Sequence, residues 1–259
     1  MIGQSFSILH LEYFLAILVR VMGAMAFAPI FGSITVTRRV RIMLGIAVSF
    51  LLFTTNPYEP LPYTTFMEYT VLLLKELVVG LSLGFTANIT LTIINMAGQF
   101  IDRELGFSMV SNFDQNFNTE TTITAEFYSM LVMIIMLCSN MHYYILSALS
   151  DSLVLIPIGN VKIDSGSLYD VMVQYMLDYF VIALRISLPV MIAIMLLNVV
   201  LGVLAKTAPQ MNMFVIGIQL KIFVGFSVLL LTVPFITSIT EYINEQMQKI
   251  VMDMLQVFY

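Results

Sequence analysis

Six long runs of apolar residues dominate the sequence and limit the folds that it can adopt. They cover residues 11–31, 40–55, 67–98, 123–149, 171–204 and 212–240. A helix needs about 20 apolar residues to cross a membrane, so the second run is short for a span, whereas the third and fifth are long enough to be tilted, kinked or double. Only 10% of the residues are charged, and a soluble domain carries about a quarter. The sequence therefore predicts an all-α integral membrane protein with about six long apolar helices arranged as hairpins.

The basic residues in the connections between these runs predict an orientation in the membrane. Lys and Arg near span ends favour the cytoplasmic side. If residue 1 lies outside and every run crosses, five bases fall in cytoplasmic connections and two outside. The five are Arg38, Arg39, Arg41, Arg103 and Lys206, and the two are Lys162 and Lys249. On that condition, both ends of the chain are expected outside.

Six charged residues lie well inside the apolar runs, away from the run ends, where each costs on the order of 3 kcal/mol at the bilayer centre. They are Arg20, Lys75, Glu76, Asp178, Arg185 and Lys221. They could form an ion or proton path, or serve as structural ion pairs or bases that reach to a span end. Asp178 and Arg185 are seven residues apart, about 10 Å along a helix axis, which is too far for a bridge within one helix. Their partners are expected on another helix or another subunit.

The sequence offers little that indicates catalysis or metal binding. The two histidines, His10 and His142, cannot form an HExxH motif, and we interpret His142 as a satisfied polar residue at a span end. No nucleophile elbow or glycine-rich phosphate loop occurs. The single cysteine, Cys138, is interpreted as a small buried hydrophobe. Because no basic run of the nucleic-acid-binding kind is present either, we expect no enzymatic activity, cofactor, metal or nucleic-acid partner.

Two local patterns predict how helices pack. Gly80 and Gly84 form a small-xxx-small pair, as do Ala24 and Ala28, and such pairs let helix backbones approach closely. In the last stretch, residues 241–259, five apolar residues recur at helical spacing with polar residues between them. They are Ile243, Met247, Ile250, Met254 and Val257. This stretch is expected to be an amphipathic helix that lies on a partner or at the membrane interface.

Several motifs in order along the chain resemble the FliR (FliR/SctT) family of the flagellar and type III secretion export gate. The longest is ALRISLPVMIAIMLLNVVLGVLAKTAPQMNMFVIGIQLKI, residues 183–222. Three further stretches agree, at residues 20–47, 98–115 and 140–159, so the resemblance covers nearly the whole chain. The sequence departs from the family pattern at Thr37, Gln115, Met141 and Gln219, and these departures affect the expected turn geometry at those positions.

The resemblance implies a function that composition does not show. Proteins of this kind assemble with FliP-type and FliQ-type subunits into a helical cone around a pore for unfolded flagellar or effector proteins, with FlhB-type and FlhA-type export proteins nearby. It implies a site in the bacterial inner (cell) membrane, within a flagellar basal body or an injectisome. It also implies a FliP-like part over residues 1–170, a FliQ-like hairpin over 171–240 and a C-terminal amphipathic helix over 241–259. The alternative is a secondary transporter or channel that uses the intramembrane charges, although only one strong helix break is evident.

The resemblance also implies roles for two polar segments. Residues 106–122 resemble the pore plug of the family, with Gly106, Phe107, Met109, Phe113 and Phe117 as its key positions. The other interpretation of this segment is an ordinary loop between helices.

The second segment, AKTAPQMN, resembles the cytoplasmic gate loop between the two arms of the hairpin. Its residues are Lys206, Pro209, Gln210, Met211 and Asn212. Pro209 lacks a backbone N–H and biases Ala208 away from helix, so the first arm is expected to end here.

Overall fold

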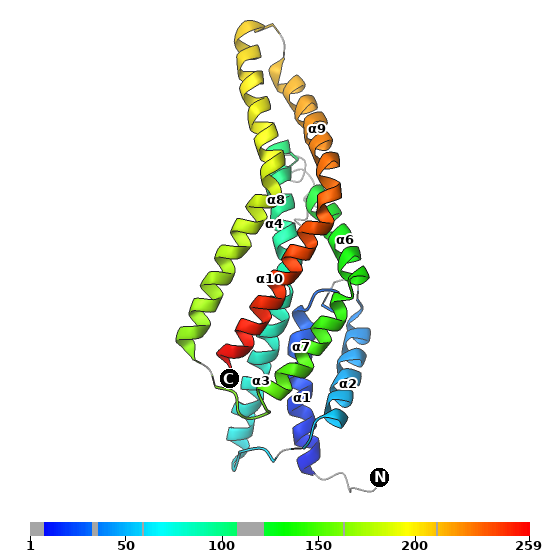
Figure 1. Ribbon diagram of the computed structural model, residues 1–259, viewed down its shortest axis with the longest axis vertical. Coiled ribbons are helices and arrows are strands. Elements are labelled where there is room, and N and C mark those ends of the chain that lie inside the picture. Colours follow the sequence, from blue (N-terminus) through cyan, green and yellow to red (C-terminus); the bar gives the residue numbers. More distant parts are fainter. Residues whose placement is uncertain (1–7, 33–35, 59, 108–121, 163, 211) are drawn as a thin grey trace. The chain divides into compact units, whose positions relative to one another are not determined.

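The computed structural model of the 259-residue chain describes residues 8–32, 36–58, 60–107, 122–162, 164–210 and 212–259. All secondary structure within these ranges is helical, which confirms the predicted fold class (Figure 1). The helices are α1 (Ile8–Phe27), α2 (Arg38–Thr55), α3 (Phe66–Ala87), α4 (Ile89–Leu105), α6 (Ile123–Cys138), α7 (Met141–Leu155), α8 (Ser165–Thr207), α9 (Met213–Thr232), the 3-10 turn η1 (Val233–Phe235) and α10 (Ile236–Val257).

Four helical stretches of the described chain are long and apolar enough to cross a membrane. They are α1, α3, residues Gly166–Thr207 of α8, and residues Phe214–Val257, which combine α9, η1 and α10. A fifth results if α6 and α7 together count as one broken span. The expected number of about six long apolar helices is therefore approximate.

Two of the predicted runs are interrupted by an asparagine. The run 67–98 divides at Asn88, where α3 ends and α4 begins. The run 123–149 divides after Cys138, and Asn140 adopts the left-handed conformation (φ 59°) just before α7. Asparagine tolerates this conformation better than most residues. Hydropathy alone does not register such a break, because the apolar residues continue on both sides of it.

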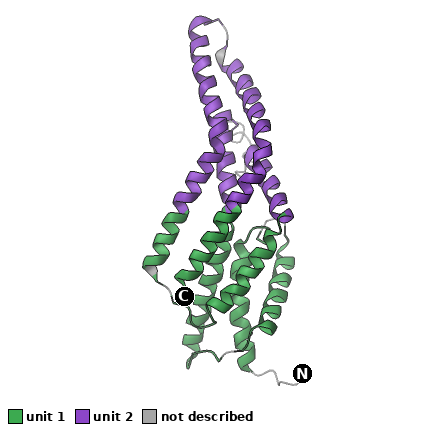
Figure 2. Ribbon diagram, viewed as in Figure 1, with its two compact units in different colours: residues 1–89, 139–175, 244–259 green, residues 90–138, 176–243 purple. Residues whose placement is uncertain are grey.

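The chain folds into two compact units (Figure 2). Unit 1 comprises residues 1–89, 139–175 and 244–259, and unit 2 comprises residues 90–138 and 176–243. Unit 1 thus holds α1, α2, α3, α7, the start of α8 and most of α10. Unit 2 holds α4, α6, α9, most of α8 and the start of α10.

Close packing of α1 against α3 organises unit 1. A Cβ atom added at Gly80 would lie 2.1 Å from the carbonyl oxygen of Arg20, and one added at Gly84 would lie 2.2 Å from that of Ala24. No larger side chain fits at either glycine unless the backbones separate. The small-xxx-small prediction is therefore confirmed. A step of four residues along α3, from Gly80 to Gly84, matches a step of four residues in the same direction along α1, from Arg20 to Ala24, so the two helices run parallel.

Helix α10 has the amphipathic pattern expected for the C-terminal stretch. The five apolar residues of that pattern are all buried: Ile243, Met247, Ile250, Met254 and Val257. Within unit 1, Tyr144 donates a hydrogen bond to the Gln248 carbonyl (3.3 Å), and Lys162 N–H donates to the Phe258 carbonyl (3.3 Å). The apolar face of α10 is thus covered by this chain itself, rather than only by a partner or the membrane interface.

In unit 2, α4 and α6 form an antiparallel pair. A Cβ atom at Gly98 would lie 2.3 Å from the Cα of Ala125, so the two backbones touch at this point. Ser129 donates a hydrogen bond to the Asn95 side chain (2.7 Å) on one side of this point. Helices α8 and α9 form a hairpin, and Gly217 of α9 lies near Leu201 of α8 (Figure 1).

Candidate functional site: a buried ion pair and two loops

Arg20 of α1 and Glu76 of α3 form a salt bridge that is completely buried in unit 1. Both side chains are 0% exposed. The Arg20 Nε and NH2 atoms each lie 2.6 Å from Glu76 Oε2. The parallel packing at Gly80 brings the two helix backbones close enough for this geometry. A buried charge is tolerated when it is paired and its remaining hydrogen-bonding positions are filled.

Backbone groups fill the remaining positions at Arg20 NH1 and at Glu76 Oε1, whereas Arg20 NH2 has its ion-pair contact with Glu76 and no hydrogen bond. Arg20 NH1 donates to the carbonyl oxygens of Ser152 (2.8 Å) and Ile156 (3.0 Å), which lie at the C-terminal end of α7. A guanidinium is stabilised there because unpaired carbonyls and the helix dipole both favour a positive charge. Glu76 Oε1 accepts from the N–H of Gly159 (3.0 Å), whose φ of +89° favours glycine. One ion pair therefore ties α1, α3, α7 and the segment that leads to α8.

The other four intramembrane charges occupy different environments. Lys75 is half-buried and donates to the Val161 carbonyl (3.4 Å) in unit 1. In unit 2, Asp178 and Lys221 are half-buried, and Arg185 is exposed. Of the six charges, all of which lie in the described ranges, Arg20 and Glu76 are the two that form a salt bridge with each other. They do so as a structural pair within one chain.

Two polar residues differ from their expected environments. Cys138 is exposed at the break between α6 and α7, so the expectation that it is buried was wrong. The buried Nδ1 of His142 has no hydrogen-bond partner among the described residues, so it is not the fully satisfied polar group that the sequence led us to expect. Both residues lie beside the Asn140 break, which the apolar pattern does not reveal.

The predicted plug begins where α4 ends. Gly106 (φ +86°) terminates the helix: its N–H donates to the Arg103 carbonyl (3.2 Å), and the Phe107 N–H donates to the Asp102 carbonyl (2.9 Å). This is a Schellman motif, in which a left-handed glycine satisfies the last free carbonyls. The other expected plug positions, Met109, Phe113 and Phe117, lie outside the described residues.

A residue that the sequence reasoning missed connects the two ends of this segment. Asp102 is 0% exposed, and its carboxylate accepts from both the N–H (2.8 Å) and the hydroxyl (2.5 Å) of Thr124, in the first turn of α6. A carboxylate is favoured at a helix N-terminus, where backbone N–H groups lack partners. In the sequence, Asp102 stands beside Arg103 and Glu104 in the stretch GQFIDRELGF, and no local pattern distinguished it from these neighbouring charges.

The predicted gate loop is a tight turn between the two arms of the hairpin. Helix α8 ends at Thr207, two residues before Pro209, as the sequence predicts. Lys206, Pro209 and Gln210 are exposed, and Met211 lies outside the described residues. Asn212 caps α9, because its side-chain oxygen accepts from the N–H of Val215 (3.4 Å).

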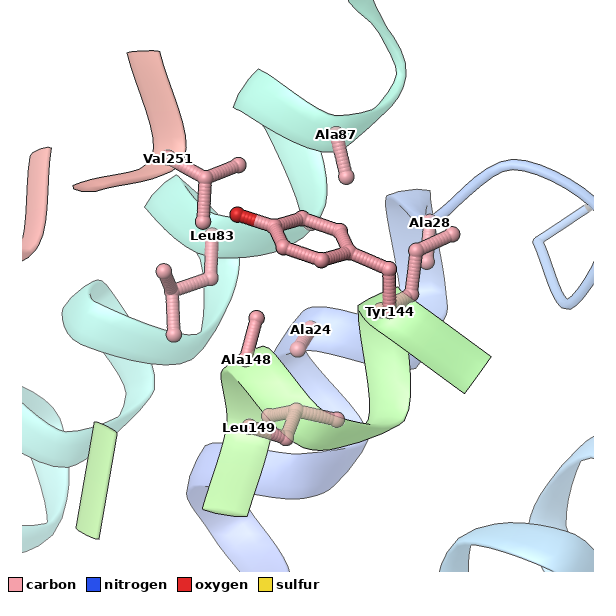
Figure 3. Close-up of a pocket in the computed structure, with 10 residues that line it drawn as sticks. Ala24, Ala28, Leu83, Ala87, Tyr144, Ala148, Leu149 and Val251 are labelled. Atoms are coloured by element: carbon pink, nitrogen blue, oxygen red, sulfur yellow. The ribbon is translucent and has the colours of Figure 1, made fainter. Parts of the chain in front are cut away.

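A small pocket in unit 1 is lined by apolar side chains around the ring of Tyr144 (Figure 3). Ala24, Ala28, Ala87 and Ala148 leave space around that ring, and no charged side chain lines the pocket. Nor does the described part of the chain contain a cluster of three or more His, Cys, Asp or Glu residues that could hold a metal ion. The pocket therefore reflects packing of small residues in the core.

These features define an all-helical membrane protein whose polar elements are a structural ion pair and helix-connecting loops. The chain belongs to the bacterial export proteins, family 1, whose family model matches residues 11–247. The resemblance to the FliR/SctT family is thereby confirmed.

Curated relatives of both the flagellar and the surface-presentation type are similar to this chain over most of its length. The flagellar biosynthetic protein FliR of Escherichia coli (strain K12) is 27% identical over 238 residues, which cover 92% of this chain and 90% of that protein. FliR of Buchnera aphidicola subsp. Acyrthosiphon pisum is 28% identical, over 84% of this chain and 83% of that protein. The surface presentation of antigens protein SpaR of Shigella sonnei is 27% identical, over 85% and 82%.

Proposed function

We propose that this chain is a subunit of the type III protein export gate and that it helps to enclose the inner-membrane pore for unfolded flagellar or effector proteins. Its partners would be FliP-type and FliQ-type gate subunits, with FlhB-type and FlhA-type export proteins at the cytoplasmic side, in a flagellar basal body or an injectisome. Membership of the export family and the similarity to FliR and SpaR support this proposal. The chain acts as a structural subunit, not as an enzyme.

The observation that carries the assembly part of the proposal is the uneven burial of the apolar helices. The most apolar 18-residue window is 44% buried in α1 and in α3, but only 17% buried in Gly166–Thr207 and in Phe214–Val257. The α8–α9 hairpin therefore offers long apolar faces that neighbouring subunits can cover. Arg185, exposed on α8 at a position that costs energy in lipid, needs protein or water beside it.

The proposed roles of the two loops follow from the resemblance and from their place in the chain. Residues 106–122 would act as the pore plug, and the turn with Lys206, Pro209, Gln210, Met211 and Asn212 would face the cytoplasmic partner. The division into a FliP-like part (1–170), a FliQ-like hairpin (171–240) and a C-terminal helix (241–259) also remains a prediction. A loop at membrane depth is tolerated when it is buried in protein or lines a water-filled path.

Co-expression and ion leakage test this proposal. Expressed alone, the chain should be unstable or aggregate, and co-expression with FliP-type and FliQ-type subunits should yield a monodisperse complex. A secondary transporter would be stable without them. Deleting residues 106–117 should leave that complex intact but let small ions cross the membrane. If the assembled complex without these residues is as impermeable to ions as the wild type, the proposal that they form a plug is refuted.

A further inference from the structure

Helix α2 lies beside α1 in unit 1, and one of its sides is exposed (Figure 1). The side that packs inward carries Gly45, Ser49 and Leu52, which are all buried. The other side carries exposed apolar residues: Val40, Met43, Ile46, Phe50 and Leu51. Met43 is 70% exposed and Phe50 is 58% exposed, so the described part of this chain covers neither of them. This side of α2 therefore needs an apolar neighbour that the chain itself does not supply.

The three arginines in the first turn of α2 differ in what they contact. Arg41 donates to the carbonyl oxygens of Phe31 (3.1 Å) and Gly32 (3.0 Å), and so joins the start of α2 to the chain that leaves α1. Arg38 and Arg39 are exposed, and neither forms a salt bridge with an acid of the described residues. Because Arg39 precedes Met43 by four residues, the two lie on the same side of the helix. Two exposed guanidinium groups thus stand at one end of the exposed apolar side.

Aromatic residues stand at the other end of α2. The helix ends at Thr55, and the exposed Tyr58 follows, with His10 stacked on its ring at a centroid distance of 4.6 Å. Tyrosine is enriched where a membrane meets water, and arginine at span ends. The 18 residues of α2 measure about 27 Å, close to the thickness of the hydrocarbon core, which is about 30 Å. Its arginines are what separate α2 from the four stretches that are apolar enough to cross a membrane.

We propose that the exposed side of α2 binds an anionic phospholipid, with Arg38 and Arg39 on the headgroup phosphate and Val40, Met43 and Phe50 against the acyl chains. A guanidinium donates paired hydrogen bonds to phosphate oxygens. A phospholipid supplies the anion and the apolar chain in one molecule, in the order in which α2 presents their partners. The inference concerns α2 alone and does not rest on the proposed function.

Quenching of an introduced tryptophan tests this proposal. The chain contains no tryptophan, so Met43→Trp gives it a single reporter, one turn from Arg39. The full chain is reconstituted into phosphatidylcholine vesicles with its co-expressed partners, or by itself if it is stable alone. The signal of the wild-type preparation is subtracted. A fixed fraction of the lipid is brominated along its acyl chains, either as phosphatidylglycerol or as phosphatidylcholine, and brominated chains quench a tryptophan that they touch.

Brominated phosphatidylglycerol should quench Met43→Trp several-fold more effectively than brominated phosphatidylcholine, since each base near an anionic lipid contributes about a factor of five in binding. In the Arg38→Gln/Arg39→Gln background the two lipids should quench equally. The matched control is Lys162→Gln/Lys249→Gln, which removes the same charge from two other exposed positions of unit 1 and should keep the preference. Added inorganic phosphate should not reduce the preference, because the acyl chains hold the lipid on α2.

Four results would overturn the proposal. If neither lipid quenches Met43→Trp, a neighbouring protein covers this side of α2. Equal quenching by both lipids in the otherwise unchanged chain would show that lipid lies there without an anionic site. A preference that the lysine control also loses would come from the overall charge of the chain, and one that inorganic phosphate abolishes would assign the arginines to a soluble anion.

Discussion

The buried ion pair predicts that Glu76→Gln will destabilise the chain strongly. The substitution keeps the shape of the side chain and an oxygen that can accept from Gly159, but it removes the charge that faces Arg20. Removing one partner of a buried pair costs about 3–5 kcal/mol, because the other charge stays buried without compensation. Arg20 NH1 keeps its bonds to Ser152 and Ile156, which places the cost near the lower end, at about 3 kcal/mol.

The assay is thermal denaturation of the co-expressed, detergent-solubilised complex, followed by the loss of its monodisperse peak. For a chain of this size each 1 kcal/mol lowers Tm by about 2–4 °C, so Glu76→Gln should lower it by roughly 6–12 °C. The matched control is Glu68→Gln on the same helix. Glu68 is exposed and accepts from the N–H of Thr64 (2.7 Å) and from that of Thr65 (3.3 Å), the N-cap of α3, and glutamine can also fill this role. Its Tm should change little.

A further variant separates the charge from the packing. Replacing both partners, Arg20→Met with Glu76→Leu, removes the uncompensated charge and should recover part of the loss seen with Glu76→Gln. Recovery should be incomplete, because the Ser152 and Ile156 carbonyls then lose a donor and Gly159 N–H loses its acceptor. Equal Tm values for Glu76→Gln and Glu68→Gln would refute this reasoning, since they would show that Arg20 does not need the charge of Glu76.

Two more predictions concern the exposed segments. Pro209→Leu should permit α8 to continue beyond Thr207 and so disturb assembly of the gate. The double variant Gln210→Ala/Asn212→Ala should leave assembly intact but reduce secretion. Normal secretion by this double variant would mean that the loop is only a turn. A hydrogen bond from Tyr63 to the Glu12 carboxylate raises the pKa of the Tyr63 phenol from its ordinary 10 to about 12, so the stabilisation by this bond is complete below pH 10 and is lost as the pH rises toward 12. In an absorbance titration of the phenolates, Tyr63→Phe should remove a step near pH 12, and an unchanged titration curve would contradict this assignment.

Features that depend on neighbours along the chain could be predicted from the amino-acid sequence. The apolar content required membrane helices, and the spacing of apolar residues over 241–259 matches the buried face of α10. The end of α8 follows from Pro209, because a missing N–H and a steric restriction on the preceding residue act locally. The Gly80/Gly84 spacing likewise indicated close helix packing, although not which helix would be the partner.

Which distant groups meet is a property of the folded chain. Arg20 and Glu76 were both recognised as costly charges, but they are 56 residues apart, and only the parallel packing of α1 with α3 makes them partners. The side chain of Leu105 packs against Gly225, which lies 120 positions later in the sequence, and no local pattern at either residue indicates this contact. A pairing of this kind depends on the relative position of two helices, which results from the packing of all their side chains together and is therefore not encoded in any single stretch of the sequence.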